Sequence, residues 1–245
     1  MTTAHELYTH WAGEPEMDSR LDESLDPRGK DWLFELFASL GPKSGDFLLD
    51  VGARDGKHFK RLVDAHGLRG LAIDPVPNGP GVAEGVIESL LLEDGSVDWI
   101  WARDMLVHVD LERGFSECRR VLKPGGRMVA YVTLATDQLE PRERAWLSDA
   151  MALANLDADK LEAAASALKL EHKVELGSEW RERMIEDGEW DPTDALLRIA
   201  RMRRLGIDSP VDGTDLDRAD LTWGIYQLLG KLCPTVYVWS KTSSA

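Results

Sequence analysis

Short apolar runs alternate with helical stripes of apolar residues through the first half of the chain. The run Phe47–Val51 indicates a short buried strand. Between Trp32 and Leu40 the apolar residues fall instead on one helical face, and Gly41-Pro42 ends that helix. This alternation predicts an α/β fold with a parallel sheet covered by helices on both faces. The expected strands of this half are Phe47–Val51, Gly70–Asp74, Gly85–Ser89, Val97–Ala102 and Met128–Thr133.

After Leu134 the pattern changes, and helical stretches dominate. Helices are expected at Glu6–Trp11, after Gly56, at Leu111–Leu122, at Lys160–Leu168 and from Asp191-Pro192-Thr193, and late strands at Val174–Leu176 and Thr235–Trp239. The chain, 1–245, is predicted to be a single domain. Its expected parts are an N-terminal cap segment at 1–30, a cofactor-binding core at 31–180, a helical lid over the active-site edge at 181–232, and the last strand and tail at 233–245.

The composition argues against several functions. The formal net charge of −15 repels phosphate backbones and anionic lipids, so neither a nucleic-acid partner nor a membrane is expected. No apolar stretch approaches the roughly 18 residues that span a bilayer, and the start of the chain lacks the pattern of a signal peptide. Two cysteines and six histidines suggest neither a disulfide framework nor a metal site. The expected location is therefore cytoplasmic.

The segment from Asp50 to Gly56 is a candidate ligand-binding turn. A buried strand ends in an acid, and glycines then open a helix. Gly52 allows the backbone to approach a ligand closely, and the helix N-terminus offers free N–H groups to an anionic group such as a carboxylate. A tight turn without a ligand would give the same short pattern, so the motif needs a second observation.

Asp74 supplies that second observation. It ends the next expected strand, about 20 residues after the glycine turn, where an acid accepts the ribose hydroxyls of a nucleoside cofactor. The dinucleotide-binding fingerprint needs two further glycines, and Arg54 and Lys57 occupy those positions. Asp50 would also repel a pyrophosphate, so it favours a cofactor that carries sulfonium and ammonium groups.

The order of motifs resembles the class I S-adenosylmethionine-dependent methyltransferases, and the small-molecule branch fits best. The resemblance covers about residues 30 to 135, and Arg120-Val-Leu-Lys-Pro-Gly-Gly is its most specific segment. It is carried by Leu49-Asp50-x-Gly52 with Gly56, Ile73-Asp74, Glu93-Asp-Gly-Ser-Val-Asp-Trp, Arg103-Asp-Met-Leu-Val-His108-Val and the Arg120 segment with Arg127-Met128. The family implies a Rossmann-like sheet of seven strands, mostly parallel with the last antiparallel, and S-adenosyl-L-methionine bound across the C-terminal strand ends.

The resemblance also assigns cofactor contacts to individual residues. It implies that the glycine turn faces the methionine moiety, that Asp74 holds the ribose, and that the segment around Val86 reads the adenine edge. The expected contacts are Asp50, Gly52, Ala53, Arg54, Gly56, Asp74, Pro75, Ile87, Glu88, Arg103 and Asp104. Arg54 replaces the usual middle glycine, and Val86 stands where the family often has an acid. The short connection from Asp74 to Gly85 has no room for the usual helix, so one sheet edge should be thin.

Three residues are candidates for a general base, namely His108, Asp104 and Glu179. His108 can instead line the cleft as a polar residue, and Asp104 can instead cap the following helix. Substrate contacts are expected from Trp180 and Arg181 beside the lid, and from Tyr8, Trp11 and Tyr226. Aromatic side chains at these places are equally typical of core or surface packing.

The function expected from these features is transfer of a methyl group from S-adenosylmethionine to a nitrogen or oxygen of a small metabolite, for example in secondary metabolism. Attack in line with the breaking bond depends mainly on near-attack geometry, and a dry, lidded pocket assists it. A non-catalytic or non-methylating protein of the same fold is the alternative, and a nucleotide-cofactor oxidoreductase is disfavoured by the glycine spacing. The identity of the acceptor and the choice between monomer and homodimer stay open.

Overall fold

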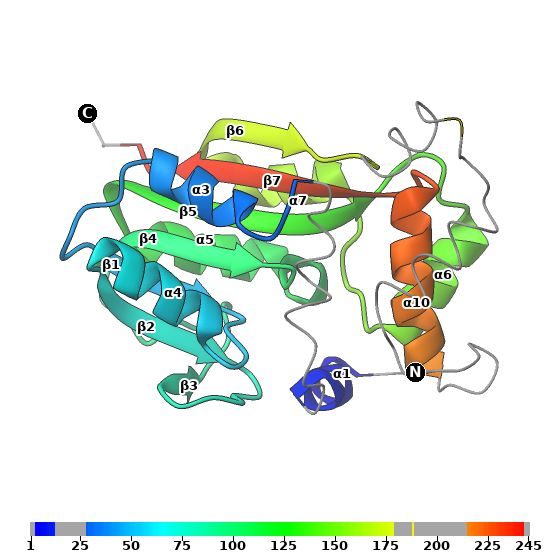
Figure 1. Ribbon diagram of the computed structural model, residues 1–245, viewed down its shortest axis with the longest axis horizontal. Helices are drawn as coiled ribbons and strands as arrows, with labels where there is room; N and C mark the ends of the chain where they lie inside the picture. The colour runs from blue at the N-terminus through cyan, green and yellow to red at the C-terminus, as the bar shows by residue number, and fades with distance from the viewer. Residues whose placement is uncertain (1–2, 13–27, 179–187, 189–214, 243–245) are drawn as a thin grey trace. The chain divides into compact units, whose positions relative to one another are not determined.

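Seven strands form one sheet in the computed structural model, which describes residues 3–12, 28–178, 188 and 215–242 (Figure 1). Their order across the sheet is β3-β2-β1-β4-β5-β7-β6, so the chain reverses its direction of travel between β1 and β4. Ligands of open α/β sheets bind at such a switch point, outside the C-terminal ends of the strands. The strands are β1 (Phe47–Val51), β2 (Arg69–Asp74), β3 (Val82–Glu84), β4 (Val97–Arg103), β5 (Leu122–Ala135), β6 (Lys169–Glu175) and β7 (Leu232–Ser240).

The directions of the strands confirm the predicted fold class. β1 pairs in parallel with both β2 and β4, so Asp50 lies opposite Ala72 on one side and Trp101 on the other. β2 with β3, and β4 with β5, are parallel as well. β7 runs against β5, because the Gly125 N–H at the start of β5 donates to the carbonyl of Lys241, just past the end of β7. The sheet is therefore Rossmann-like and mostly parallel, with an antiparallel last strand.

Four of the described helices cover the two faces of this sheet (Figure 1). α3 and α4 lie on one face, and α5 and α7 lie on the other. The apolar stripe of α5 explains its docking, since Phe115 is buried against Trp239 of β7 with 5.2 Å between ring centroids. The helices are α3 (Trp32–Ser39), α4 (Lys57–His66), α5 (Leu111–Val121) and α7 (Ala158–Ala164).

An aromatic layer joins α3 to the middle of β4. Phe34 stacks on Trp101 with 5.5 Å between centroids, and Phe37 meets Trp99 edge-on at 5.0 Å. The Arg61 guanidinium of α4 lies 3.8 Å from the centroid of Phe34. Aromatic pairs of this kind stabilise the fold by about 0.5–1.5 kcal/mol beyond the contribution of the area that they bury. The helix predicted between Trp32 and Leu40 is thus confirmed as α3, and its buried residues are Leu33, Phe34 and Phe37.

Several boundaries differ from the sequence prediction. The late strand expected at Val174–Leu176 is β6, Lys169–Glu175. The third strand is Val82–Glu84 and not Gly85–Ser89, because β2 ends at Asp74, opposite Glu84, and the Ser89 N–H bonds back to Val86 in a turn. The connection from β2 to β3 carries no helix, as expected.

The fifth strand was expected at Met128–Thr133, but β5 starts at Leu122 and includes Lys123–Gly126. The register of β4 with β5 shifts between Val97 and Trp99, as in a β-bulge. At Gly126 a Cβ atom would lie 3.0 Å from the carbonyl oxygen of Val97, so the missing side chain lets the strand continue.

The chain clusters into two compact units, and most of the sheet belongs to the unit formed by residues 33–132, 154–174 and 235–245. The other unit contains α1 (Ala4–Ala12), α6 (Pro141–Ala150) and α10 (Asp215–Leu228). α6 begins with a reciprocal capping box, in which Glu140 and Glu143 each accept the other's backbone N–H. α10 lies in the predicted lid, whereas the helix expected from Asp191 lies outside the described residues, so the lid and the division of the domain stay predictions. No described helix is long and apolar enough to cross a membrane.

Candidate active site

The turn between β1 and α4 has a left-handed backbone at three of its residues. Gly52 and Gly56 have φ values of 76° and 75°, which glycine adopts without strain. The N–H groups of Gly52 and Ala53 both donate to the carbonyl of Ile73, at 2.9 and 3.0 Å, and tie the turn to β2. A Cβ atom at Gly52 would lie only 3.0 Å from the side chain of Met105. The glycine is therefore required both by the backbone and by a close neighbour.

Arg54 is the third left-handed residue, with a φ of 47°. A non-glycine residue in this region costs of order 1 kcal/mol, so the surroundings must hold it there. Its N–H donates to Asp74 Oδ2 at 2.8 Å, and its carbonyl accepts the N–H of Asn78 at 2.9 Å. The guanidinium lies 3.7 Å from the carboxylate of Asp55. Arg54 thus adopts a conformation typical of glycine and adds a cation to an acidic neighbourhood.

Asp74 is anchored at the end of β2 by two backbone donors. Its Oδ2 accepts the N–H of Arg54, and its Oδ1 accepts the N–H of Val76 at 2.8 Å. Burial raises the pKa of Asp74, although these two N–H groups and the Arg54 guanidinium act in the opposite direction. Each carboxylate oxygen keeps a second lone pair. The carboxylate can therefore accept further hydroxyl donors, and its predicted contact with a ribose stays a prediction.

Asp50 is the buried acid at the end of β1, with 2 % of its surface exposed. It accepts the backbone N–H of Phe59 in the first turn of α4, whereas its Oδ2 has no hydrogen-bond partner among the described residues. Burial, followed by the nearby charge of Asp74, raises the pKa of Asp50 to about 8. A buried carboxylate oxygen without a donor is costly, and a bound cation would relieve that cost. The expected contact of Asp50 with a cationic group of the cofactor stays a prediction.

The segment expected at the adenine edge follows β3 and packs on α5. Ile87 is buried against Gly114, where a Cβ atom would lie 3.3 Å from its side chain. Glu88 Oε1 accepts the backbone N–H of Asp110 at 3.0 Å. Val86 is the residue of this segment with the large exposed apolar side chain, 43 % of it accessible. Glu88 thus has a structural partner at the start of α5, and the expected adenine contacts of Ile87 and Glu88 stay predictions.

Arg103 and Asp104 form the end of β4. The guanidinium of Arg103 is buried, lies 3.2 Å from His58 Nε2 of α4, and faces the ring of Tyr131 at 5.8 Å. Asp104 is half-buried and has a φ of 54°, and its N–H donates to the carbonyl of Tyr131 at 2.8 Å. These contacts tie the end of β4 to α4 and β5. The expected cofactor contacts of both residues stay predictions.

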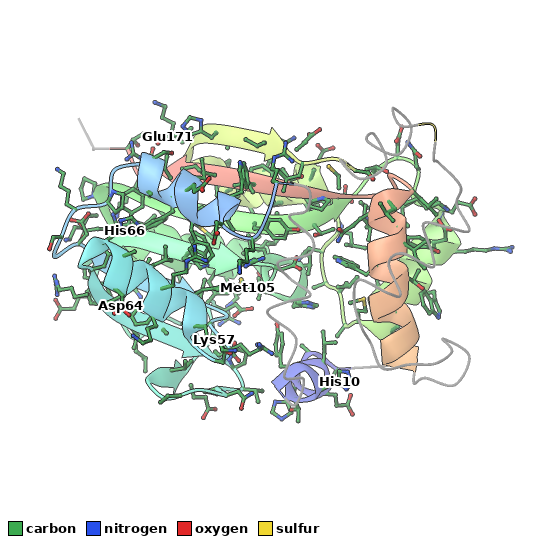
Figure 2. The ribbon with its side chains drawn as sticks, viewed as in Figure 1. His10, Lys57, Asp64, His66, Met105 and Glu171 are labelled. Carbon is green, nitrogen blue, oxygen red and sulfur yellow. The ribbon has the colours of Figure 1, made fainter. Side chains whose placement is uncertain are left out.

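His108 lies in a single turn of 3₁₀ helix, Leu106–His108. Asp110 caps α5, with its side chain accepting the N–H of Arg113 at 3.1 Å, so the helix starts at Leu111, as its apolar stripe predicted. His108 is half-buried. Figure 2 labels Met105, which precedes this turn, and Lys57, the first residue of α4. Met105, which packs on Gly52, was not identified from the sequence, because an apolar residue after a strand has no distinctive pattern.

The predicted substrate residues are described only in part. The Tyr226 hydroxyl donates to Glu143 Oε1 at 3.1 Å, and burial together with Glu143 raises the pKa of Tyr226 to about 12. This contact gives Tyr226 a role in joining α10 to α6. Tyr8 is half-buried in α1. The side chain of Trp11 and the whole of Glu179, Trp180 and Arg181 lie outside the described residues. In the described part of the chain, no three His, Cys, Asp or Glu side chains gather as a metal site would require.

A family of sequences described as "Methyltransferase domain" matches residues 49–130, the part of the chain that carries the glycine turn, Asp74 and the end of β4. Over these residues the chain is similar to the class I S-adenosylmethionine-dependent methyltransferases. An uncharacterised methyltransferase of Mycobacterium bovis is 35% identical over 115 residues, which are 43% of this chain and 44% of that protein. The malonyl-acyl-carrier-protein O-methyltransferase of Methylococcus capsulatus is 36% identical over 123 residues, 44% of each chain. The chain thus spans less than half the length of these relatives.

Solved methyltransferase structures share the fold. Phosphoethanolamine N-methyltransferase 2 of Haemonchus contortus, solved with phosphomonomethylethanolamine and S-adenosylhomocysteine, has a TM-score of 0.70 at 15% identity, covering 99% of this chain and 61% of that one. Geranyl diphosphate C-methyltransferase of Streptomyces coelicolor, solved with Mg²⁺, geranyl diphosphate and S-adenosyl-L-homocysteine, has a TM-score of 0.67 at 16% identity and covers 98% of both chains. At these identities the likeness establishes the fold alone.

Proposed function

We propose that this chain binds S-adenosylmethionine and transfers its methyl group to a nitrogen or oxygen of a small metabolite, for example in secondary metabolism. The observation that carries the proposal is the buried Asp50 Oδ2, which has no donor among the described residues and lies on the strand that leads into the glycine turn. An ammonium group supplies both a donor and a positive charge, a sulfonium group supplies the charge alone, and S-adenosylmethionine carries both groups.

The charges at these strand ends also argue against a dinucleotide. Asp50 and Asp74 are buried, and Asp50 experiences the negative charge of Asp55 as well as that of Asp74. A pyrophosphate would add further negative charge to this group, and like charges in a partly dry site cost free energy. The positive charge of Arg54 offsets only part of this negative charge, since the Arg54 guanidinium already faces Asp55. The oxidoreductase alternative is therefore disfavoured on electrostatic grounds as well as by the glycine spacing.

Some residues of the chain would bind the cofactor, and others would accept a proton. The turn from Gly52 to Gly56 would receive the methionine moiety, and Asp74 would accept the ribose hydroxyls. The bound cofactor supplies a methyl group on a sulfonium sulfur, and that carbon–sulfur bond breaks as the acceptor atom bonds to the carbon. His108 or Asp104, both half-buried, would hold the proton that an acceptor hydroxyl or ammonium gives up, with Glu179 as the third candidate. An amine that arrives neutral needs no base for the transfer.

The relatives and the neighbours in fold do not fix the atom that is methylated, and one relative is named for an acceptor on a carrier protein. They include a phosphoethanolamine N-methyltransferase and a malonyl-acyl-carrier-protein O-methyltransferase, and a neighbour in fold is a geranyl diphosphate C-methyltransferase. The net charge of −15 disfavours a nucleic-acid acceptor. The position of the acceptor near the end of β4 is inferred from the topology, since the switch point lies between β1 and β4.

The test is a pair of measurements on the full chain. Calorimetry should show binding of S-adenosylhomocysteine and no binding of NAD, and radiolabelled S-adenosylmethionine with a panel of small amines, alcohols and carboxylic acids should give labelled product. Asp50→Leu, which removes the carboxylate and keeps a similar volume, should bind S-adenosylhomocysteine about tenfold more weakly while staying folded by circular dichroism. Binding of NAD but not of S-adenosylhomocysteine would refute the proposal.

A non-methylating protein of the same fold is the second candidate. One solved neighbour is named as a 4+2 cyclase, with a TM-score of 0.66 at 17% identity, covering 89% of this chain and 82% of that one. The same cofactor site would serve such a protein. Tight binding of S-adenosylhomocysteine, with no label transferred to any member of the panel or of a metabolite extract, would favour this second candidate.

A further inference from the structure

The segment that leaves β4 is held from outside by two residues far away in the sequence. The Asn155 side chain donates from Nδ2 to the carbonyl of Val109 at 2.6 Å and to that of Leu106 at 3.4 Å. The backbone N–H groups of Ala154 and Asn155 both donate to the carbonyl of Val107, at 2.8 and 3.0 Å. We call these two residues the clasp and residues 105–109 the β4 turn. Three of the five carbonyls of the β4 turn therefore accept from the clasp.

The opposite side of the β4 turn rests on the glycine turn. A Cβ atom at Gly52 would lie 3.0 Å from both Cβ and Cγ of Met105, so the two segments are in direct contact. Met105 is buried, as are the other apolar side chains of the β4 turn. Asp104 precedes it with a φ of 54°, a conformation that a non-glycine residue keeps only under constraint. The β4 turn is thus confined between Gly52 on one side and the clasp on the other.

A single 3₁₀ turn does not hold its shape without such support. A helix of one turn leaves most of its carbonyls without partners inside the helix, and short 3₁₀ segments have poor hydrogen-bond geometry. The amide of Asn155 offers N–H donors on one nitrogen to two carbonyl acceptors, which is the complementary pattern. A carboxylate in the same place would bring two acceptors against carbonyl oxygens and repel them. The geometry therefore requires an amide at this position and not merely a polar residue.

We propose that Asn155 is a positioning residue for methyl transfer, which sets the β4 turn, and with it His108 and Asp104, against the glycine turn that would receive the cofactor. The proposal rests on the proposed function, since it assigns the reacting acceptor to the side of the site that the β4 turn forms. Asn155 acts through the carbonyls that it holds and touches neither reactant. Small displacements of groups that orient reactants reduce rates strongly, by about a hundredfold for 1 Å.

The test compares Asn155→Ala and Asn155→Asp with Tyr237→Phe. The control removes a hydrogen bond of the same unit, from the Tyr237 hydroxyl to Glu162 at 3.0 Å, which involves neither the clasp nor the β4 turn. Asn155→Ala should lower kcat about tenfold or more and change the Kd for S-adenosylhomocysteine less than about threefold, because Asp50, Asp74 and the bonds to Ile73 are untouched. Asn155→Asp should be worse than Asn155→Ala. Tyr237→Phe should change neither kcat nor Kd.

Amide hydrogen exchange separates this proposal from the proposed function. Residues 105–109 should exchange about tenfold faster in Asn155→Ala than in the wild type, and those of β1 should not. If the wild type transfers no methyl group, the proposed function fails, and the exchange rates still decide whether Asn155 fixes the β4 turn. Unchanged exchange in the β4 turn, or a kcat for Asn155→Ala equal to that of Tyr237→Phe, would overturn the proposal. Should Asn155→Asp not fold, Asn155→Ser, which keeps one short donor, should give a kcat between those of the wild type and Asn155→Ala.

Discussion

The ends of β1 and β2 differ from the end of β4 in what determines their geometry. At β1 and β2 the contacts are short-range or come from the neighbouring strand: Asp74 accepts from Arg54 and Val76, and Asp50 accepts from the first turn of α4. At β4 the backbone is determined by Asn155, which follows β4 by about 50 residues. The first region is under electrostatic constraint, because it buries two acids, and the second is under steric and hydrogen-bond constraint.

This difference explains why the cofactor is easier to infer than the acceptor. A buried acid, a glycine turn and a second acid form a pattern that stays within a stretch of chain and selects the charge of a ligand. The β4 turn carries His108 and Asp104, which stay candidates, because their position depends on partners that the local pattern does not reveal. If the two regions are independent, a substitution in one should leave the binding or stability contributed by the other unchanged.

The largest expected effect is at Asp74. Asp74→Ala removes the acceptor for a ribose and also the acceptor for two backbone N–H groups, so the Kd for S-adenosylhomocysteine should rise about a hundredfold, equivalent to about 2.8 kcal/mol. The Kd for 5′-methylthioadenosine, which has the same ribose but no amino acid group, should rise by a similar factor. Calorimetry measures both values. Asp74→Asn keeps one acceptor oxygen for the backbone and is the matched control for folding; an unchanged Kd in both variants would contradict the ribose assignment.

The second effect is the dependence of stability on pH, which Asp50 should dominate. Its pKa in the folded chain is about 8, above the 3.8 of an unperturbed aspartate, so the folded state binds a proton that the unfolded state has lost. The free energy of unfolding of the ligand-free protein should therefore fall as the pH rises from about 4 to about 8 and then level off. Burial is the main cause of the raised pKa, and Asp74 and Asp55 add to it.

Asp50→Asn isolates that contribution, since it keeps the oxygen that accepts from Phe59 and cannot ionise. Between pH 5 and pH 8.5 the unfolding free energy of the wild type should fall by about 2 kcal/mol more than that of the variant, as measured by chemical denaturation. This difference is smaller than the shift in pKa alone would give, because structural relaxation and water entry reduce the cost of the buried charge. The raised pKa of Asp74 contributes a slope of the same sign to both proteins. Equal slopes in the two proteins would show that Asp50 is ionised in the folded chain at neutral pH.

The third effect separates the two acids by ligand. Asp50→Asn should raise the Kd for S-adenosylhomocysteine about tenfold, or about 1.4 kcal/mol, because the ammonium group of the ligand loses its charged partner. The Kd for 5′-methylthioadenosine, which lacks that ammonium group, should stay unchanged. Asp74→Ala affects both ligands, so the two variants form a matched pair. An equal loss for both ligands in Asp50→Asn would mean that Asp50 acts on the ribose side or on the fold.

The sequence predicts the part of the site whose contacts are local. Phe47–Val51 is confirmed as β1 to the residue, and Asp74 is confirmed as the end of β2, next to Asp50's strand. The third strand was predicted too late in the sequence, at Gly85–Ser89. Its position is decided by pairing with the last residues of β2, Ala72 to Asp74, and not by its apolar content. Asn155 had no detectable pattern, since an asparagine after an apolar stretch is common and its partners are backbone carbonyls. Tyr226 was assigned from its residue type alone, and its hydroxyl bonds to Glu143.

The smallest effect concerns Arg54, where local and electrostatic constraints meet. Its φ of 47° strains any residue with a Cβ atom, whereas glycine adopts it freely. Arg54→Gly and Arg54→Ala both remove the guanidinium that faces Asp55, so their difference in unfolding free energy reports the backbone strain alone, and Arg54→Gly should be the more stable by about 1 kcal/mol. The flexibility of glycine in the unfolded chain opposes this gain in part. If Arg54→Ala is as stable as Arg54→Gly in chemical denaturation, the backbone at this position is not strained. The hydrogen bonds to Asp74 and from Asn78 would then not hold the turn in a fixed conformation, and the turn would be as mobile as the β4 turn is expected to be without its clasp.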